Sequence, residues 1–158
     1  MSKEIERKFL VNKELWDKHN KTEGIILRQG FLVNKIEKVV RVRIISNKAF
    51  LTIKGPTINI SRNEFEYEIP VSDAESLLSQ FCENEITKIR FNPVIGGMKW
   101  DVDEFLNENE GLLMAEIELE SEDQEFEKPE WLGKEVSDDF RYYNAYLIDN
   151  PYKFWEKS

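Results

Sequence analysis

The strongest constraint on the fold is charge at every second position in several short segments. In the first of these, residues 4–9, Glu4, Glu6 and Lys8 alternate with neighbours that include Ile5 and Phe9. Successive side chains of a β-strand point to opposite faces, so this period of two predicts a strand with three charges on one face. The same period recurs in residues 39–45, 50–55, 62–69, 86–91, 99–105 and 112–120. We therefore expect a mainly β (α+β) protein built from many short antiparallel strands.

Length and composition fit one domain that spans residues 1–158. Of the 158 residues, 41% are hydrophobic, which is enough to build a core. The formal charge is -9, from 31 acidic and 22 basic residues. Nucleic acids and anionic membranes attract proteins with an excess of positive surface, so neither is expected as a partner. An anionic ligand would have to meet a local basic cluster.

Cysteine and histidine are too scarce to support several common kinds of site. Cys82 is the single cysteine, which excludes an internal disulfide, and its apolar neighbours predict a buried small hydrophobe. His19 is the single histidine and lies among polar residues, which argues against a histidine-based catalytic triad or zinc site. A metal would therefore be a hard ion held by oxygen. With no signal-like start and no long apolar segment, we expect a cytoplasmic location.

Three segments predict helices around the strands. Asn12 is expected to cap a short helix, and Ser72 with Glu75 forms a predicted capping box before a helix that ends near Phe81. Gly30 lies within a strand-like run and suggests a β-bulge. If the strands close into a barrel, helices near residues 13–19, 73–82 and 142–149 would cover its outer face.

The spacing of the strands suggests a closed or nearly closed sheet, but alternation alone leaves open which face points inward. With the charges outside, the interior would be an ordinary core of isoleucine, valine, leucine and phenylalanine. With the charges inside, they would line a cavity, which is costly unless a polyanion and metal ions neutralise them.

Three properties of the sequence favour the inward orientation. The first is that acidic and basic residues are separated by strand. The acidic pairs are Glu4 and Glu6, Glu64 and Glu66, Asp101 and Asp103, and Glu116 and Glu118; the basic pairs are Arg41 and Arg43, and Lys88 and Arg90, with Lys8, Lys54 and Arg62 in addition. The second is that basic pairs suit phosphate oxygens, while paired carboxylates suit Mg²⁺ or Mn²⁺. The third is the apolar bulk of the opposite faces, which would need cover from helices outside the barrel.

Seven motifs follow one another along nearly the whole chain: EIERKFLV, VRVRI, LTIKG, RNEFEYEIP, KIRF, WDVDEF and AEIELE. In this order, and with the later WLGKEVSDDFRYYN, they resemble the CYTH superfamily, the triphosphate tunnel metalloenzymes, in its short single-domain bacterial form. A lone ExExK motif would be weak evidence, whereas the ordered set is specific. The resemblance implies an eight-stranded antiparallel closed β-barrel tunnel, with charged residues pointing in and helices packed outside.

The resemblance also implies roles for individual residues. Divalent metals, Mg²⁺ or Mn²⁺ with two ions per site, would be bound by Glu4, Glu6, Asp103, Glu116 and Glu118. Phosphate oxygens would be bound by Lys8, Arg41, Arg43, Lys54, Lys88 and Arg90, with Arg62 assisting. Glu64 and Glu66 would hold the second metal or position water. The expected catalytic group is Glu4, Glu6, Lys8, Lys54, Glu64 and Glu66.

Four further positions bear on the site. Many short family members have tyrosine where this chain has Phe31, so a hydroxyl that would contact substrate or water is missing. Glu68, Asp101 and Glu120 share the parity of the site residues, and each is expected either at the rim of the tunnel or on the surface.

The function expected from these residues is metal-dependent hydrolysis of a small-molecule triphosphate, with inorganic triphosphate as the first candidate. The enzyme alternatives are a nucleoside or thiamine triphosphatase and a class IV adenylate cyclase. A non-catalytic polyphosphate-binding module is the alternative outside enzymes. The sequence leaves open whether the chain is a monomer or a homodimer.

Overall fold

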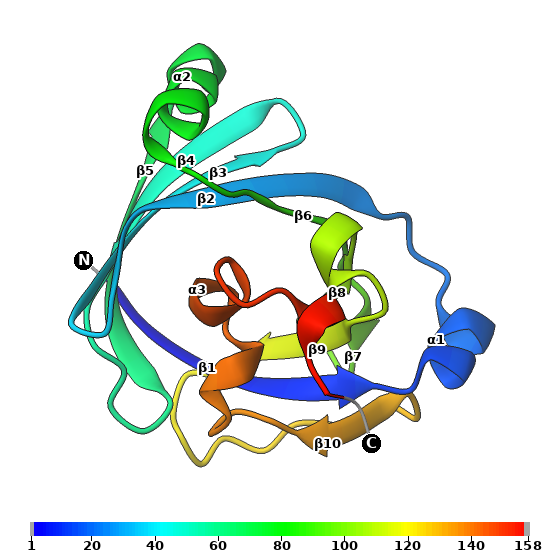
Figure 1. Cartoon of the computed structure of the whole chain (residues 1–158). Helices are drawn as coiled ribbons and strands as arrows, with labels where there is room; N and C mark the ends of the chain where they lie inside the picture. Colours follow the sequence, from blue (N-terminus) through cyan, green and yellow to red (C-terminus); the bar gives the residue numbers. More distant parts are fainter. Residues whose placement is uncertain (1, 157–158) are drawn as a thin grey trace.

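Eight antiparallel strands form a closed ring in the computed structural model, which describes residues 2–156 (Figure 1). In ring order the strands are β1 (Ser2–Val11), β5 (Ser61–Ile69), β4 (Lys48–Lys54), β3 (Lys38–Ile45), β2 (Ile25–Lys35), β6 (Ile86–Phe91), β8 (Met98–Phe105) and β9 (Leu113–Glu118), which returns to β1. Two short strands, β7 (Val94–Ile95) and β10 (Leu132–Glu135), pair with β8 and β1. The predicted mainly β fold with an eight-stranded closed barrel is confirmed.

Strand β1 closes the ring because different parts of it pair with β5 and with β9. Its first residues pair with β5, with Ser2 opposite Glu64, and its middle pairs with β9, with Glu6 opposite Glu118. Phe9 and Val11 also pair with β10, opposite Glu135 and Leu132. A closed ring leaves no free edge between its strands, so all inward side chains share one enclosed space.

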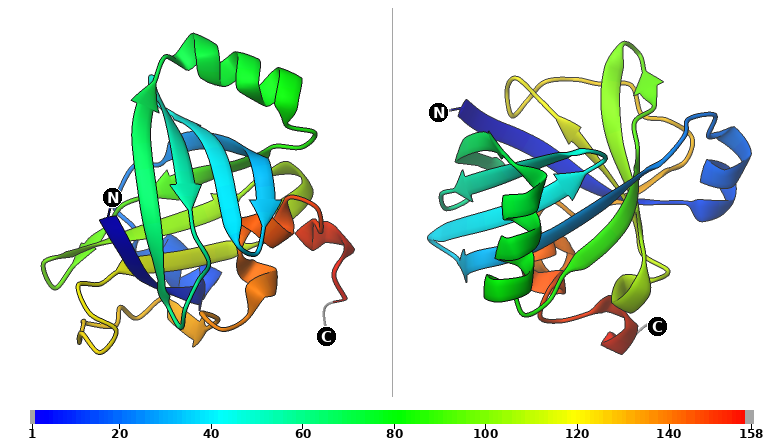
Figure 2. Two further views of the ribbon diagram at one scale, coloured as in Figure 1. Left: turned by 90° about the vertical axis from the view of Figure 1, so that its left-hand side faces the viewer. Right: turned by 90° about the horizontal axis from the view of Figure 1, so that it is seen from above.

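Two helices pack on the outer face of the barrel, as the sequence predicts. Helix α2 (Val71–Phe81) covers the wall formed by β2, β3 and β4 (Figure 2) and buries Ala74 and Leu78 against Val42. Helix α1 (Lys13–His19) places Trp16 against the apolar outer side of β1, β8 and β9. The predicted cap of α1 is confirmed, because Asn12 Oδ1 accepts a hydrogen bond from the Leu15 N–H at 3.0 Å.

Two local predictions are wrong. Helix α2 begins at Val71 after Pro70 with no side-chain cap, so Ser72 and Glu75 form no capping box. Glu75 instead accepts a hydrogen bond from Arg28 on β2. The irregularity in β2 lies between Phe31 and Val33, so Gly30 forms no bulge.

Gly30 instead allows helix α2 to approach the barrel. A Cβ atom added at Gly30 would lie 2.9 Å from Leu78 Cδ2 and 3.0 Å from Cys82 Cβ. These separations are too short for carbon atoms, because the van der Waals optimum lies near 3.5–4.0 Å. Glycine at this position therefore sets the contact between α2 and β2.

Residues 142–149, the third segment that was expected to cover the outer face of the barrel, do not lie on that face. The segment with η2 (Phe140–Tyr142), α3 (Asn144–Leu147) and η3 (Tyr152–Phe154) closes one end of the barrel, where Figure 1 shows α3 within the ring. Leu147 and Ile148 pack on inward-facing Ile86, Phe105 and Met114. The short η1 (Asn107–Asn109) lies beside η3, where Asn109 Oδ1 accepts a hydrogen bond from the Tyr152 N–H. Across residues 2–156, no helix is both long and apolar enough to cross a membrane.

Candidate active site

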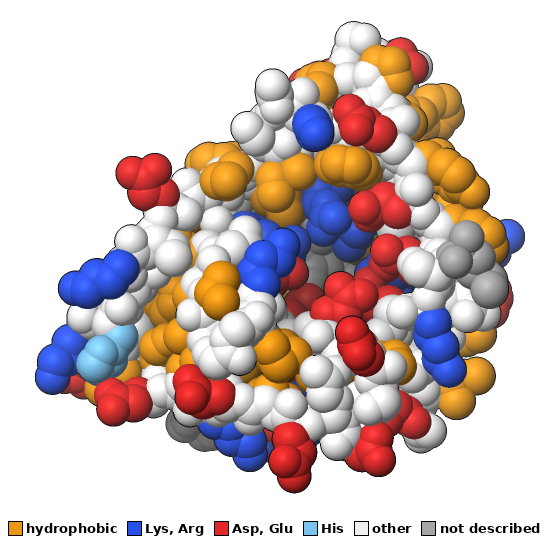
Figure 3. All heavy atoms as spheres, turned by 180° about the vertical axis from the view of Figure 1, so that it is seen from behind, with side chains coloured by type: hydrophobic (Ala, Val, Ile, Leu, Met, Phe, Trp, Pro, Cys, Tyr) orange, Lys and Arg blue, Asp and Glu red, His pale blue; other side chains and the backbone are white. Residues whose placement is uncertain are grey.

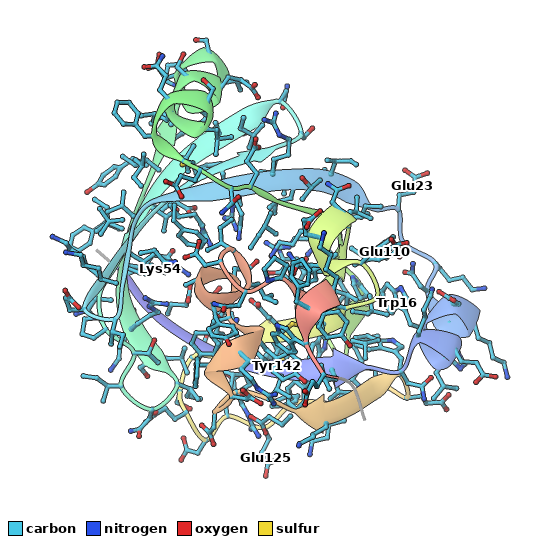
Figure 4. All side chains as sticks on the ribbon, viewed as in Figure 1. Trp16, Glu23, Lys54, Glu110, Glu125 and Tyr142 are labelled. Carbon is cyan, nitrogen blue, oxygen red and sulfur yellow. The ribbon has the colours of Figure 1, made fainter. Side chains whose placement is uncertain are left out.

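The charged faces of the strands point into the barrel and line a cavity of about 430 Å³. In the view from behind, acidic and basic side chains gather around a hollow in the surface (Figure 3). Lys54 points into the ring, whereas Glu23 and Glu125 point away from it (Figure 4). The lining includes eight basic and seven acidic residues: Lys8, Arg41, Arg43, Lys54, Arg62, Lys88, Arg90 and Lys99, and Glu4, Glu6, Glu64, Glu66, Asp101, Glu116 and Glu118.

Lys8 lies between two carboxylates at the centre of the β1–β9 wall. Its Nζ is 2.7 Å from Glu116 Oε1 and 3.0 Å from Glu6 Oε1. Strand register explains the contact, because Lys8 is directly opposite Glu116. Burial alone would lower the pKa of Lys8, but the charges of Glu116 and Glu6 outweigh it and raise the pKa. Lys8 is therefore a fixed cation at neutral pH.

Lys54 has the same arrangement on the opposite side of β1. Its Nζ is 3.0 Å from Glu4 Oε2 and 3.5 Å from Glu64 Oε2, and Lys54 is opposite Glu64 across β4 and β5. Burial and a hydrogen bond shared with Glu64 raise the pKa of Glu4, and Lys54 opposes them. Two carboxylates thus approach each other here, with one ammonium group between them.

Arg41 and Arg43 form the basic wall on β3. Their distances to Glu66 Oε2 are long, 3.8 Å from Arg41 Nη2 and 3.5 Å from Arg43 Nη2. The Nε atoms of both arginines are buried without a hydrogen-bond partner among residues 2–156. Burial lowers the pKa of both groups, and for Arg43 the neighbouring charges of Arg41 and Arg90 lower it further. Because both side chains line the cavity and their terminal nitrogens make only long contacts with Glu66, they are well suited to receive an anion.

Asp103 anchors the basic residues at the other wall. It receives two hydrogen bonds from Arg90, at 2.8 and 2.9 Å, and lies 2.7 Å from Lys88 Nζ. Burial would raise the pKa of Asp103, but the charges of Lys88 and Arg90 outweigh it and lower the pKa to about 2. For Lys88 burial dominates and lowers the pKa to about 8, although Asp103 opposes it. Asp103 is 2% exposed and lies behind the cavity surface.

The cavity brings together thirteen of the fourteen residues that the sequence assigns to the site. The exception is Asp103, which contacts Lys88 and Arg90 but does not line the cavity. Of the three positions left open, Asp101 lines the cavity. Glu68 and Glu120 are exposed and lie outside it. Phe31 lines the cavity and also contacts the apolar cluster at the closed end.

Several lining residues were missed from the sequence. Lys99 precedes Asp101 by two positions, so the parity of β8 could have identified it. Tyr143 and Asn144 belong to the C-terminal segment, which was expected outside the barrel. Lys8 Nζ lies 5.1 Å from the centre of the Tyr143 ring, close enough for a cation–π contact. No sequence period marks these two residues, because they lie outside the strands and reach the cavity only through the docking of the C-terminal segment.

The donor set of the cavity suits a hard divalent cation. Burial, followed by the charges of Glu4, Glu6 and Asp101, raises the pKa of Glu118. Glu118 has no ion-pair partner among the described residues. A cation placed among these carboxylates would relieve their repulsion. Among residues 2–156, no group of three or more histidine, cysteine, aspartate or glutamate side chains is arranged to hold a metal ion by itself.

Comparison with known proteins agrees with the fold and the sequence motifs. Residues 2–146 match the CYTH domain family. The chain is 48% identical over 154 residues to the inorganic triphosphatase of Acetivibrio thermocellus, with 97% of each chain covered. It is 33% identical over 148 residues to the inorganic triphosphatase of Nitrosomonas europaea, covering 91% of this chain and 95% of that protein. The crystal structure of the inorganic triphosphatase NE1496 matches with a TM-score of 0.66 and 32% identity, covering 94% of this chain and 95% of that one. Sequence and architecture therefore agree over nearly the whole length, and the chain belongs to the CYTH domain family.

Proposed function

We propose that this protein hydrolyses inorganic triphosphate, with release of phosphate, in a reaction that depends on a divalent metal ion. The observation that carries this proposal is the cavity itself, in which a basic wall that includes Arg41 and Arg43 shares one space with seven carboxylates. The two relatives described above are named inorganic triphosphatases. A cavity of about 430 Å³ suits a compact substrate.

The balance of charge supports the involvement of metal ions. Eight basic and seven acidic residues give the lining nearly zero net charge. Each phosphoryl group of a triphosphate carries at least one negative charge, so the lining alone would leave the bound substrate poorly neutralised. We propose that Mg²⁺ or Mn²⁺, with two ions per site, supplies the missing positive charge; such ions neutralise phosphoryl oxygens and lower the pKa of bound water.

We propose the following division of labour among the chain's own residues. Arg41, Arg43 and Arg90 hold phosphoryl oxygens through planar guanidinium groups, which bind two oxygens at once. Other basic residues add single contacts to the substrate: Lys8, Lys54, Arg62 and Lys88. The metal ions would be held by Glu4, Glu6, Glu116 and Glu118. Glu64 and Glu66 would hold the second ion or orient the attacking water.

Asp103 stays a predicted metal ligand that no observation tests. Its two hydrogen bonds with Arg90 and its contact with Lys88 support a different proposal, in which Asp103 fixes these cations from behind the cavity. Asp101 reaches the cavity surface two residues earlier on β8 and is the better placed of the two carboxylates to meet a metal ion.

We also propose that residues 1–158 form one domain of CYTH type with a small-molecule substrate. The segment after the family match packs on the barrel through Leu147, Ile148 and Trp155, which supports one folding unit.

Phosphate release from tripolyphosphate in the presence of Mg²⁺ or Mn²⁺ tests the function. We expect activity in the wild type and a loss of at least about tenfold in Glu4→Gln, because a neutral amide is a poor ligand for a hard cation. Lys54 keeps Glu64 as a partner in this variant, so the fold should persist. Glu125→Gln, on the outside of the barrel, is the matched control. Equal rates in the wild type and Glu4→Gln would refute the proposal.

A substrate panel separates the alternatives. Tripolyphosphate, ATP, thiamine triphosphate and pyrophosphate are each incubated with Mg²⁺, Mn²⁺ or Ca²⁺, and the products are identified. Phosphate from tripolyphosphate supports the proposal, whereas a cyclic nucleotide with pyrophosphate would indicate a cyclase. Binding of polyphosphate without turnover under every metal would indicate a binding module.

A further inference from the structure

Asn144 begins α3 and lies where the cavity meets the closed end of the barrel. Its Oδ1 accepts hydrogen bonds from Lys88 Nζ at 3.0 Å and from Gln29 Nε2 at 2.9 Å. Both donors are almost completely buried, with exposed fractions of 2% for Lys88 and 1% for Gln29. A buried ammonium group needs acceptors, so Asn144 helps to hold Lys88 in place.

The chemistry of Lys88 determines the orientation of the Asn144 amide. An ammonium group donates hydrogen bonds and accepts none, so the amide atom that faces it is oxygen and the NH₂ group points elsewhere. Nδ2 of Asn144 has no hydrogen-bond partner among the described residues, and it is not among their buried unpaired atoms. Because Asn144 lines the cavity, we place this NH₂ group at the cavity surface.

Lys88 presents a matching donor to the same place. Asp103 takes one of its protons at 2.7 Å and Asn144 takes a second. An ammonium group has three protons, so neither acceptor takes the third proton of Lys88. Lys88 lines the cavity, and its Nζ also lies 5.1 Å from the centre of the Phe105 ring. The closed end thus offers two hydrogen-bond donors, Asn144 Nδ2 and Lys88 Nζ, whose side chains hold each other in place. Such a fixed pair of donors suits an anionic oxygen.

We propose that Asn144 is a substrate-binding residue that recognises the phosphoryl group at the closed end of the cavity. Its Nδ2 donates a hydrogen bond to a phosphoryl oxygen, while its Oδ1 keeps Lys88 directed at the same group. This inference deepens the proposed function and rests on it. The placement of α3 has independent support, because Asn34 Nδ2 donates a hydrogen bond to the Ala145 carbonyl at 2.7 Å.

Two substitutions at Asn144 separate substrate binding from a merely structural role. Asn144→Asp keeps an acceptor for Lys88 and Gln29 but places a negative oxygen where the NH₂ group was. Asn144→Ala removes both functions and adds no charge. Asn34→Asp is the control, since it introduces the same charge and removes a hydrogen bond to the same segment, at a residue that does not line the cavity.

The test is to measure KM and kcat for tripolyphosphate with Mg²⁺, and the Kd for tripolyphosphate by calorimetry without metal, in the wild type and in each variant. Asn144→Asp should raise KM and Kd at least tenfold, which corresponds to about 1.4 kcal/mol, and more than Asn144→Ala does. Asn34→Asp should remain within about twofold of the wild type, a difference well below 1 kcal/mol.

The reverse order, with Asn144→Ala impaired and Asn144→Asp close to the wild type, would overturn the inference, because it is the order expected of a structural hydrogen bond. Equal defects in Asn144→Asp and Asn34→Asp would also overturn it. If the wild type binds tripolyphosphate but does not hydrolyse it, the proposed function fails, while the order of the Kd values still tests Asn144.

Discussion

Replacing Asp103 by asparagine removes one negative charge from the buried cluster with Lys88 and Arg90 and changes the side-chain shape very little. Asp103 is 2% exposed and Lys88 is 2% exposed, so water cannot take over the lost contacts. The two cations would be left buried beside an amide. Two estimates from the structure set the expected loss of stability.

The first estimate comes from the pKa of Asp103. Lys88 and Arg90 lower it from 3.8 to about 2 against the effect of burial. At neutral pH this difference between the folded and unfolded states contributes about 2 kcal/mol to the free energy of unfolding. The second estimate is the loss of roughly 3–5 kcal/mol measured when one partner of a buried ion pair is removed. Asp103→Asn should therefore lower the melting temperature by roughly 10 °C for a chain of this size.

The sign of the pH dependence is fixed by the direction of the shift. A carboxyl group with a lowered pKa in the folded state stabilises the fold above its unfolded value of 3.8, and this contribution disappears as the pH falls through about 2. The stability gap between the wild type and Asp103→Asn should therefore narrow by about 1 kcal/mol between pH 5 and pH 3.

Urea unfolding at pH 7, 5 and 3 measures these differences through the midpoint and the slope. Asp101→Asn is the matched control, because Asp101 is partly exposed and lies 3.7 Å from Arg90 Nη1, so its loss should cost at most about 1 kcal/mol. A change below about 0.5 kcal/mol in Asp103→Asn would refute the anchoring role. Increased stability of the metal-free variant would instead favour Asp103 as a metal ligand.

Two further predictions concern the metal and the outer core. Chelation of divalent ions should abolish phosphate release but change the melting temperature by less than about 2 °C, because Lys8 and Lys54 already pair with four of the lining carboxylates, Glu4, Glu6, Glu64 and Glu116. Calorimetry of the chelated protein measures this change, and unfolding on chelation would contradict the prediction. Trp16→Ala should cost about 3–5 kcal/mol, because Trp16 is 4% exposed and packs edge-on against Trp131 and Phe91. Urea unfolding measures the loss, and a cost below about 1 kcal/mol would show that α1 adds little to the core.

The sequence predicted the strands well because the charged period of two is long and repeated. It also selected nearly all of the charged cavity lining, since residues of equal parity on one strand share a face whichever way that face points. The predictions of a capping box before α2 and of a bulge at Gly30 were wrong, because contacts with residues distant in the sequence decide these features. Glu75 is bound to Arg28 of another element, and Gly30 is explained by the approach of Leu78.

The closed end of the cavity was also missed, although the sequence contains a signal for it. On four strands the inward positions change from charged to apolar: Lys8 is followed by Leu10, Lys88 is preceded by Ile86, Asp103 is followed by Phe105, and Glu116 is preceded by Met114. Each change is unremarkable alone. Their meaning appears once the strands are aligned by register, which places all four apolar residues at one end.

By itself, the sequence of this chain determined which side chains share a strand face, because the direction of side chains along a strand depends only on local backbone geometry. Glu4, Glu6 and Lys8 therefore had to lie on the same face of β1. Which face is enclosed, which carboxylate meets which lysine, and where Asn144 enters the cavity were decided by the tertiary structure. Ring closure, strand register and the docking of the C-terminal segment depend on contacts between residues far apart in the chain.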